Sequence, residues 1–380
     1  MAEVVEAVTP ILYTDDEKRF VSMGLGGMSE ARSCRVLWKC NGLYELEMEY
    51  PVSGRRFADL KGRRIIWASV GPDEEPQPFR IYHIRKPILG LVKIYARHVV
   101  YDLMGHTLRP FAAAGLSEAL AQLNGGATVQ PHGITISSDM VSTAACTVAV
   151  PRSVWSMLGG AEGSLLDTYR GEWLFTGYSA ILKERLGEDL NVVVRYGKNL
   201  QTLEQEENLA NTWTGVQPYW YDELEGTLVT LPEEVISAGS FDHVRVRVLD
   251  LSAEFEAAPT VEQLRARAQR FIADNHVGEP SVGLDIRFVP LDQTEEYKGR
   301  AFLNKIHKGD TVRVEFPTSY DRRTGEPRAF VQTSARAVQY VWLPMKDKYE
   351  SVRLGSVKAD FADAVAQLQK DVSWVMTQVR

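Results

Sequence analysis

The alternation of residue types in residues 44–50 constrains the fold more than any other feature of the sequence. The segment is YELEMEY, in which four apolar residues alternate with three glutamates. Successive side chains of a strand point to opposite faces, so this period of two predicts a strand with one buried face and one wet face. Asn41-Gly42 before it and Pro51 after it are typical of a turn and of a strand end.

Three further strands are predicted before residue 96, in residues 65–67, 79–84 and 91–95. The connections between them contain Gly71-Pro72 and Lys86-Pro87. Several short strands at this spacing are typical of a small barrel or sandwich. We expect residues 1–95 to form a first barrel-like β domain.

Residues 96–190 have a mixed pattern. Ser117 is a candidate cap for a short helix that runs to residue 123, and glycines bound two more short helices in residues 153–158 and 164–169. Two strands follow, in residues 172–175 and 178–182. We therefore expect an α+β insert domain in residues 96–190.

A strand that runs into a turn is predicted where β structure resumes at residue 191. The segment NVVVRYGKNL begins with β-branched residues, which favour a strand, and its turn would consist of Tyr196, Gly197, Lys198 and Asn199. A phosphate-binding loop needs two glycines spaced across six residues and a Ser or Thr after the lysine, but Asn199 follows Lys198. We interpret Lys198 as a solvated turn residue.

Residues 191–240 and 300–355 together are expected to form a second barrel-like β domain. Within it, a turn at Lys308-Gly309-Asp310 leads into a strand in residues 312–316, and residues 338–343 form the return strand of a hairpin. Residues 241–299 are expected to be a second α+β insert. There, Thr260 and Gln263 form a capping box that starts a helix over 261–274, between strands in 244–248 and 282–289.

The last segment, residues 356–380, predicts an amphipathic helix. Its apolar residues lie alternately four and three positions apart, which is the heptad spacing of a coiled coil. We expect five of them to contribute to oligomerisation: Phe361, Val365, Leu368, Val372 and Val375. Three heptads are compatible with a parallel bundle at a symmetry axis or with packing on the protein's own body.

Composition excludes some classes of function. Asp and Glu number 50 against 43 Lys and Arg, and this net charge of −7 argues against binding of the phosphate backbone as the main activity. Cys34, Cys40 and Cys146 form no C-x-x-C pair, so reduced, buried thiols are expected. We see no signal peptide and no apolar run of about 20 residues, and we expect a soluble product made in the cytoplasm with no membrane anchor.

No segment predicts catalysis, a metal site or a cofactor site. His98, Asp102 and His106 would line one face of a helix as a metal site, but residues 99–101 favour a strand, on which this spacing does not converge. The aromatic residues Trp213 and 219–221 could stack on sugars or bases, or fill a core or an interface. The motifs of zinc peptidases and serine hydrolases do not occur.

Four segments carry a resemblance to a known family. In order they are NGLYELEMEYP (41–51), PFRIY (78–82), GGAEGSLLDTYRGE (159–172) and YGKNL (196–200), and shorter segments continue to residue 355. Over about residues 20–355, the sequence resembles the phage minor structural protein family, also called the prophage endopeptidase tail family.

The resemblance implies an α+β, mainly β fold with two barrel-like domains, similar to the hub of phage baseplates. It implies a homotrimeric hub at the tail tip of a long, non-contractile-tailed phage, and hence a virion protein. Such a hub would cap the tail tube, join it to the distal tail protein and gate DNA ejection. Its other partners would be the tape measure protein and a tail fibre or receptor-binding protein, and DNA would contact it only in transit.

The word endopeptidase in the family name is not transferred to this chain. Many family members carry an enzymatic extension after the hub, and residue 380 follows directly after the predicted heptad helix. We therefore expect a structural protein rather than an enzyme. Two alternatives stay open at this stage, a cell-wall (peptidoglycan) hydrolase and a carbohydrate-binding tail adhesin that uses the aromatic residues near Trp220.

Overall fold

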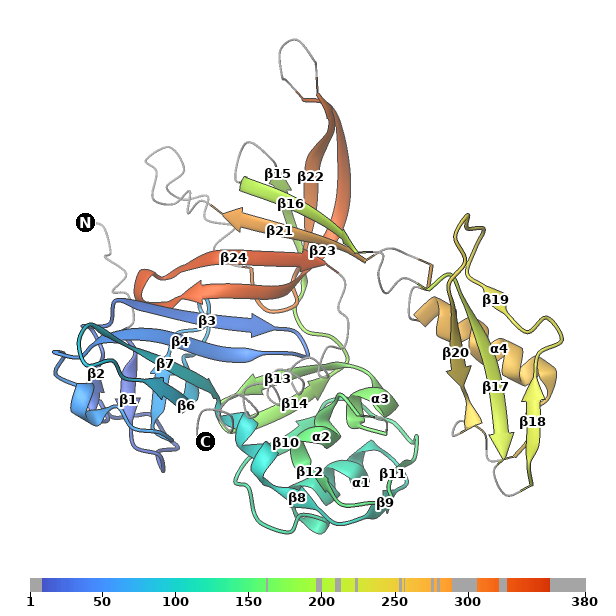
Figure 1. The fold of residues 1–380 in the computed structure, drawn as a ribbon, viewed down its shortest axis with the longest axis horizontal. Helices are drawn as coiled ribbons and strands as arrows, with labels where there is room; N and C mark the ends of the chain where they lie inside the picture. The colour runs from blue at the N-terminus through green and yellow to red at the C-terminus, as the bar shows by residue number, and fades with distance from the viewer. Residues whose placement is uncertain are drawn as a thin grey trace. The chain divides into compact units, whose positions relative to one another are not determined.

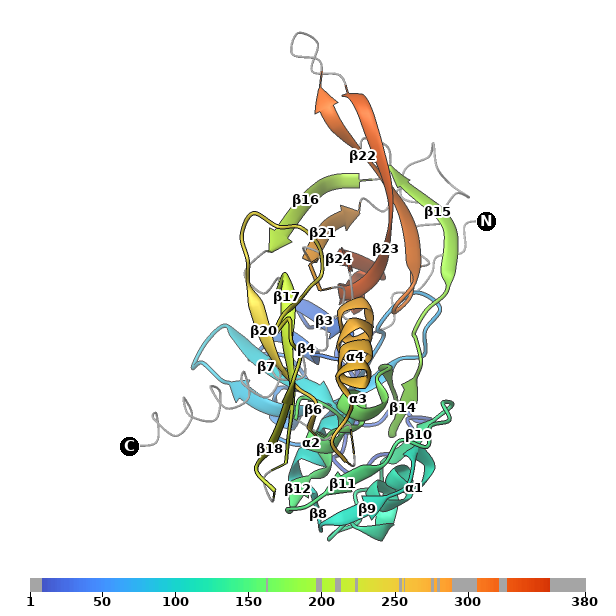
Figure 2. The same ribbon diagram turned by 90° about the vertical axis from the view of Figure 1, so that its right-hand side faces the viewer.

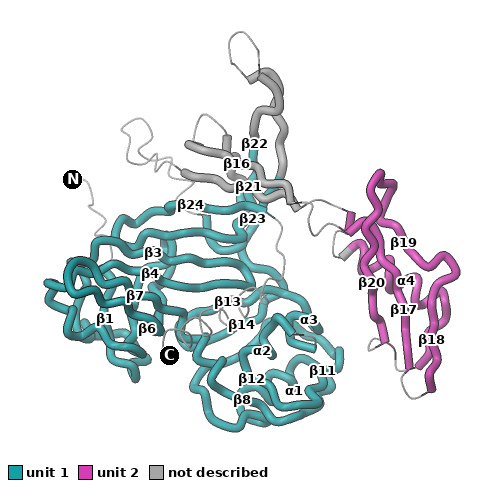
Figure 3. The backbone as a smooth tube through the Cα atoms, viewed as in Figure 1, with its two compact units in different colours: residues 1–204, 284–380 teal, residues 205–283 magenta. Residues whose placement is uncertain are grey.

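In a computed structural model, the described residues are 9–161, 163–195, 200–208, 213–222, 225–252, 255, 257–274, 277–278, 281–288, 306–320 and 327–355. The chain divides into two compact units (Figure 3). Unit 1 consists of Met1–Glu204 with Leu284–Arg380, and unit 2 consists of Gln205–Gly283.

A large sheet dominates unit 1. The strands that the first hundred residues contribute are β1 (Ile11–Tyr13), β2 (Gly26–Gly27), β3 (Ser33–Lys39), β4 (Tyr44–Pro51), β5 (Ile65–Ala68), β6 (Gln77–Arg85) and β7 (Leu91–His98). They lie in the order β3-β4-β7-β6-β5-β1-β2, and each pair is antiparallel (Figure 1). A short helix, η1 (Phe57–Asp59), lies between β4 and β5.

The alternation that predicted β4 is confirmed. Every second residue of the strand from Tyr44 onward is buried, and the glutamates between them are partly exposed. The predicted strands in residues 65–67, 79–84 and 91–95 are confirmed as β5, β6 and β7. Strand β3 was missed, although its residues also alternate between buried and more exposed positions.

The C-terminal strands continue the same sheet. They are β15 (Asp189–Arg195), β16 (Leu200–Asn208), β21 (Ser281–Phe288), β22 (Thr311–Tyr320), β23 (Pro327–Leu343) and β24 (Lys348–Gly355), with a short helix η8 (Pro344–Lys346) before β24. Strand β23 pairs antiparallel with β3, so that Tyr340 lies opposite Trp38. Within the described residues the sheet has thirteen strands, and it curls into a half barrel (Figures 1 and 2).

The pairing of β23 with β3 joins the two β-rich blocks that we expected to be separate barrel-like domains. One hydrophobic core runs through both blocks and includes Val36, Met48, Val312 and Trp342. The division into two barrels, which the resemblance implies for the assembled ring, therefore remains a proposal.

A smaller lobe of unit 1 follows β7. Its helices are η2 (Val99–Gly105), α1 (Leu116–Ala121), η3 (Gln122–Gly126), α2 (Val154–Leu158) and α3 (Leu165–Tyr169). Its strands are β8 (Thr107–Leu108), β9 (Phe111–Ala113), β10 (Thr135–Ser138), β11 (Cys146–Val148), β12 (Arg152–Ser153), β13 (Glu172–Thr176) and β14 (Ser179–Lys183). This mixture of helices and strands agrees with the expected α+β character.

Two local predictions in this lobe are wrong. Ser117 is not a helix cap, because α1 begins at Leu116 with Gly115 at its N-cap, which places Ser117 inside the first turn. Glu118 accepts a hydrogen bond from Ala114 N just before the helix. Residues 99–101 are not a strand, because β7 ends at His98 and the chain turns into η2. The His98 ring accepts a hydrogen bond from Val100 N and thereby caps this turn.

Unit 2 is a small sheet with a helix. It contains β17 (Gly215–Asp222), β18 (Thr227–Thr230), β19 (Ile236–Ser237), β20 (Val246–Asp250) and α4 (Val261–Asp274). Its own core includes Val216, Trp220, Leu249, Leu264 and Phe271, from the sheet and from α4, which lies along the sheet (Figures 1 and 2). The observed unit, residues 205–283, differs in its bounds from the expected insert over 241–299.

Helix α4 has the predicted bounds, and it begins at the predicted residue because its capping box forms. Thr260 N donates to Gln263 Oε1 at 2.8 Å, and Gln263 N donates to Thr260 Oγ1 at 3.3 Å. These two bonds satisfy backbone donors that the first turn of a helix leaves open.

Two predicted features lie outside the described residues. They are the turn at Tyr196, Gly197, Lys198 and Asn199 and the heptad stripe of residues 361–375. Both stay predictions. Among the described helices, none is long and apolar enough to cross a membrane. The three cysteines are free and buried, as predicted.

Candidate functional site

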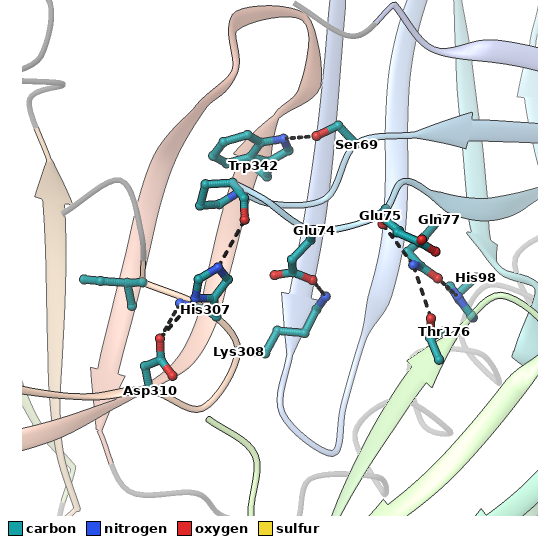
Figure 4. Close-up of polar contacts among 12 residues, drawn as sticks. Ser69, Glu74, Glu75, Gln77, His98, Thr176, His307, Lys308, Asp310 and Trp342 are labelled. Carbon is teal, nitrogen blue, oxygen red and sulfur yellow. Dashed lines mark hydrogen bonds and ion pairs between the residues drawn. The ribbon is translucent and has the colours of Figure 1, made fainter. Parts of the chain in front are cut away.

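Residues 69–77, which join β5 to β6 and include Gln77 as the first residue of β6, contact both strand β23 and the smaller lobe (Figure 4). Ser69 Oγ accepts a hydrogen bond from Trp342 Nε1 on β23 at 3.1 Å. Gln77 Oε1 accepts one from Gly177 N at 2.7 Å, next to β13. We call residues 69–77 the central connection.

The turn before β22 packs against the central connection. His307 Nε2 lies 3.2 Å from Pro72 O, and Lys308 forms an ion pair with Glu74 (Figure 4). Gly309 has a φ of 80°, in the left-handed region that glycine tolerates, and a Cβ there would overlap the backbone of Leu186. The predicted turn at Lys308-Gly309-Asp310 is therefore confirmed, with close backbone packing as its physical reason.

Asp310 holds this turn together. Its Oδ2 accepts a hydrogen bond from His307 N at 2.7 Å, and its Oδ1 accepts one from Glu188 N at 2.8 Å. Burial acts to raise the pKa of Asp310, but these hydrogen bonds outweigh it and lower the pKa. The pKa of His307 is raised, chiefly because its ring contacts the Asp310 carboxylate.

A second buried ion pair ties β23 to the smaller lobe. The Arg336 guanidinium donates to both oxygens of Glu172, at 2.7 and 2.8 Å, and Glu172 Oε2 also accepts from Leu186 N at 2.8 Å. The Glu172 side chain is only 7% exposed and that of Arg336 20%. This parallel, two-bond geometry is the strongest form of an ion pair.

His98 is a buried, neutral histidine. Its Nε2 lies 3.2 Å from Gln77 Oε1, and its ring stacks on Tyr44. Burial, with the nearby positive charge of Lys308, lowers the pKa of His98 to about 3. The His98 ring therefore has two structural roles. Its contact with Gln77 joins the end of β7 to the central connection, and its bond with Val100 N caps η2.

The three residues considered as a metal site serve separate partners. Asp102 accepts from Arg80 Nε at 2.8 and 2.9 Å, and the His106 ring packs edge-on against His132. Among the residues that the structure describes, no group of three His, Cys, Asp or Glu could hold a metal ion. The polar groups of this region act as structural contacts between segments that are far apart in the sequence.

The aromatic residues of β17 divide between the two faces of its sheet. Trp220 is buried in the core of unit 2, where its Nε1 donates to Phe255 O. Tyr221 is 42% exposed, and Tyr219 donates to Asp250 Oδ2 at 2.6 Å. Trp220 is one of the aromatic residues that the adhesin alternative would use, and its burial in the core leaves it unable to stack on a sugar.

One exposed apolar feature was missed. At the tip between β6 and β7, Ile88 is 96% and Leu89 81% exposed. A signal for it lies in the sequence, because Lys-Pro-Ile-Leu-Gly connects two predicted strands where polar turn residues are usual. We call these two residues the apolar tip.

Comparison with solved structures shows which fold this is. The chain is similar to the prophage tail protein gp18 from Listeria monocytogenes EGD-e, with a TM-score of 0.56 and 14% identity over 96% of this chain and 100% of that one. It is also similar to the tail protein from Neisseria meningitidis MC58, with a TM-score of 0.58 and 10% identity over 94% of this chain and 98% of that one.

A third similar structure is the 43 kDa tail protein of prophage MuSo2 from Shewanella oneidensis, with a TM-score of 0.54 and 12% identity over 86% of this chain and 94% of that one. No protein-family model matches the sequence, and no curated protein does. The chain therefore has the fold of prophage tail proteins. Within that class, the match spans nearly the whole of each protein.

Proposed function

We propose that this protein is a structural component of a phage tail, and specifically the homotrimeric hub of the tail tip. The observation that carries the proposal is the similarity to gp18, which extends over 96% of this chain and 100% of that tail protein. The order of the segments that resemble the phage minor structural protein family supports the same proposal.

As a hub, the protein would cap the tail tube, contact the distal tail protein and gate DNA ejection. The tape measure protein and a tail fibre or receptor-binding protein would be its further partners. Mass photometry of the purified chain, alone and with its distal tail protein, tests the trimer. We expect a mass of about three times 42.6 kDa, and a monomer under both conditions would refute the trimer.

We propose that the apolar tip is a contact between copies. Large aliphatic side chains exposed to this degree gain stability when a partner covers them. The double variant Ile88→Asp/Leu89→Asp should therefore dissociate the trimer. Val141→Asp changes one exposed aliphatic residue outside the apolar tip, also 96% exposed, and should leave the trimer intact if the contact is specific to the tip. If both variants remain trimeric, the tip is not a contact between copies.

The heptad stripe gives a second test of assembly. Changing Leu368 and Val372 to Asp should weaken the trimer if residues 356–380 pair between copies. If the helix packs on its own body, the trimer will persist in this variant.

The adhesin is kept as a second candidate because Tyr219 and Tyr221 alternate with the buried Trp220 on β17. Side chains two residues apart on a strand share one face, and aromatic faces stack on sugar rings. Under this candidate, Tyr221→Ala abolishes binding of the purified chain to host cell-wall saccharide. If no saccharide binding is found in the unaltered chain, the adhesin is refuted.

A further inference from the structure

Three side chains from separate parts of the chain lie around the buried ammonium group of Lys308. Lys308 precedes β22, Glu74 lies in the central connection, Tyr44 begins β4 and Tyr340 lies on β23. Lys308 Nζ forms an ion pair with Glu74 Oε2 and lies 5.3 Å from the centre of the Tyr44 ring and 6.0 Å from that of Tyr340. We call these four residues the Lys308 cluster.

The hydrogen bonds within the cluster do not account for all of its polar atoms. Three buried oxygens have no hydrogen-bond partner among the described residues, namely Tyr44 Oη, Tyr340 Oη and Glu74 Oε1. The Lys308 side chain is only 8% exposed, and Glu74 is the one hydrogen-bond acceptor shown for its three N–H groups. Buried polar groups without a partner are costly, and native proteins leave few of them.

The chemistry of the cluster defines what could complete it. Lys308 and Glu74 carry opposite charges that cancel, so the site offers no net attraction for an ion. Burial, with Glu74 nearby, raises the pKa of both Tyr44 and Tyr340 well above its usual value, so both hydroxyls remain neutral donors and acceptors. A small, uncharged group that can both donate and accept hydrogen bonds would satisfy these three oxygens.

We propose that the Lys308 cluster is a binding site for ordered internal water. Water hydrogen-bonds there to Lys308 Nζ, Glu74 Oε1 and the two tyrosine hydroxyls. Buried water of this kind typically makes about three hydrogen bonds to groups that lack protein partners. Tyr44 and Glu74 belong to the N-terminal β-rich block, and Lys308 and Tyr340 belong to the C-terminal one. The water therefore joins the two blocks, which also pair through β3 and β23.

Removing one hydroxyl at a time tests the proposal through the sign of the effect. If water satisfies the hydroxyls, Tyr340→Phe and Tyr44→Phe each lose a hydrogen bond, and the unfolding equilibrium constant rises about threefold to tenfold. If the hydroxyls have no partner at all, phenylalanine removes an unpaired polar group, and the same constant falls. A fall in both variants overturns the proposal.

Tyr101→Phe is the matched control, because this buried hydroxyl donates to Gly42 O at 2.9 Å and accepts from Tyr44 N at 3.1 Å. It should destabilise the protein, with the same sign as the two cluster variants. A crystal structure that resolves ordered water gives a direct measurement that needs no variant. We expect a water within about 3.2 Å of Glu74 Oε1 and of a tyrosine Oη, and clear density without water at the cluster would overturn the proposal.

Discussion

The ion pair between Glu172 and Arg336 gives the sharpest prediction of stability. Glu172→Gln keeps the shape of the side chain but leaves the buried Arg336 guanidinium without its counter-charge. Breaking a buried pair from one side costs about 3–5 kcal/mol, and because Arg336 is still 20% exposed, we expect the lower end, about 3 kcal/mol.

Urea unfolding monitored by tryptophan fluorescence measures this cost, since Trp173 is the next residue on β13. With a denaturant slope of about 3 kcal/mol per M, the midpoint of the transition that includes unit 1 should fall by about 1 M. Adding Arg336→Met to Glu172→Gln should restore part of the loss, because the double variant no longer buries an unpaired charge.

The matched control is Glu350→Gln, which breaks the Arg35–Glu350 pair on the solvent face of the sheet. Those side chains are 47% and 41% exposed, so their pair should contribute less than about 1 kcal/mol. If Glu172→Gln and Glu350→Gln shift the midpoint equally, the Arg336 pair does not hold the lobe to the sheet, and the reasoning is refuted.

Three further predictions concern titration and capping. The pKa of His98 in the folded protein is lowered to about 3. Stability should therefore fall as pH drops below about 6.5, because the unfolded chain takes up a proton there that the folded chain does not. The urea midpoint of His98→Gln should depend less on pH between 6.5 and 5 than that of the unaltered protein. The pKa of His307 is raised in the folded protein, so its contribution to stability is fully present below about pH 6.5 and is lost as pH rises through the folded pKa. Asp310→Asn should remove this loss of stability at higher pH. An unchanged dependence of the urea midpoint on pH would contradict the assignment. Thr260→Ala should destabilise unit 2 by about 1 kcal/mol in urea unfolding. Thr260→Ser keeps the hydroxyl and should retain most of the stability of the unaltered protein. Equal stability of all three proteins would show that the capping box contributes nothing.

Local patterns predicted those elements that local physics determines. The alternation in residues 44–50 predicted β4, and the Thr260 and Gln263 side chains predicted the start of α4, because each pattern acts within a few residues. Ser117 misled the prediction, since a serine can cap a helix or lie within its first turn, and only the fold decides between the two.

Long-range pairing could not be predicted in this way. Nothing in the residues of β3 or β23 identifies the other as its partner, and the two β-rich blocks therefore looked separate. The role of the central connection was missed for the same reason. Its polar groups find their partners only when the fold brings Trp342, His307 and Lys308 against them. The apolar tip could have been found from its sequence, since two large aliphatic residues in a hairpin connection are unusual.

The central proposal is that this chain, which has the fold of prophage tail proteins, is a structural part of the phage tail tip, and locating it on assembled particles tests that proposal most directly. Electron microscopy of phage particles whose copy of this chain carries a labelled epitope would show its position. We expect label only at the end of the tail, arranged with threefold symmetry about the tail axis. Label along the tube or on the head, or particles without any label, would contradict the account.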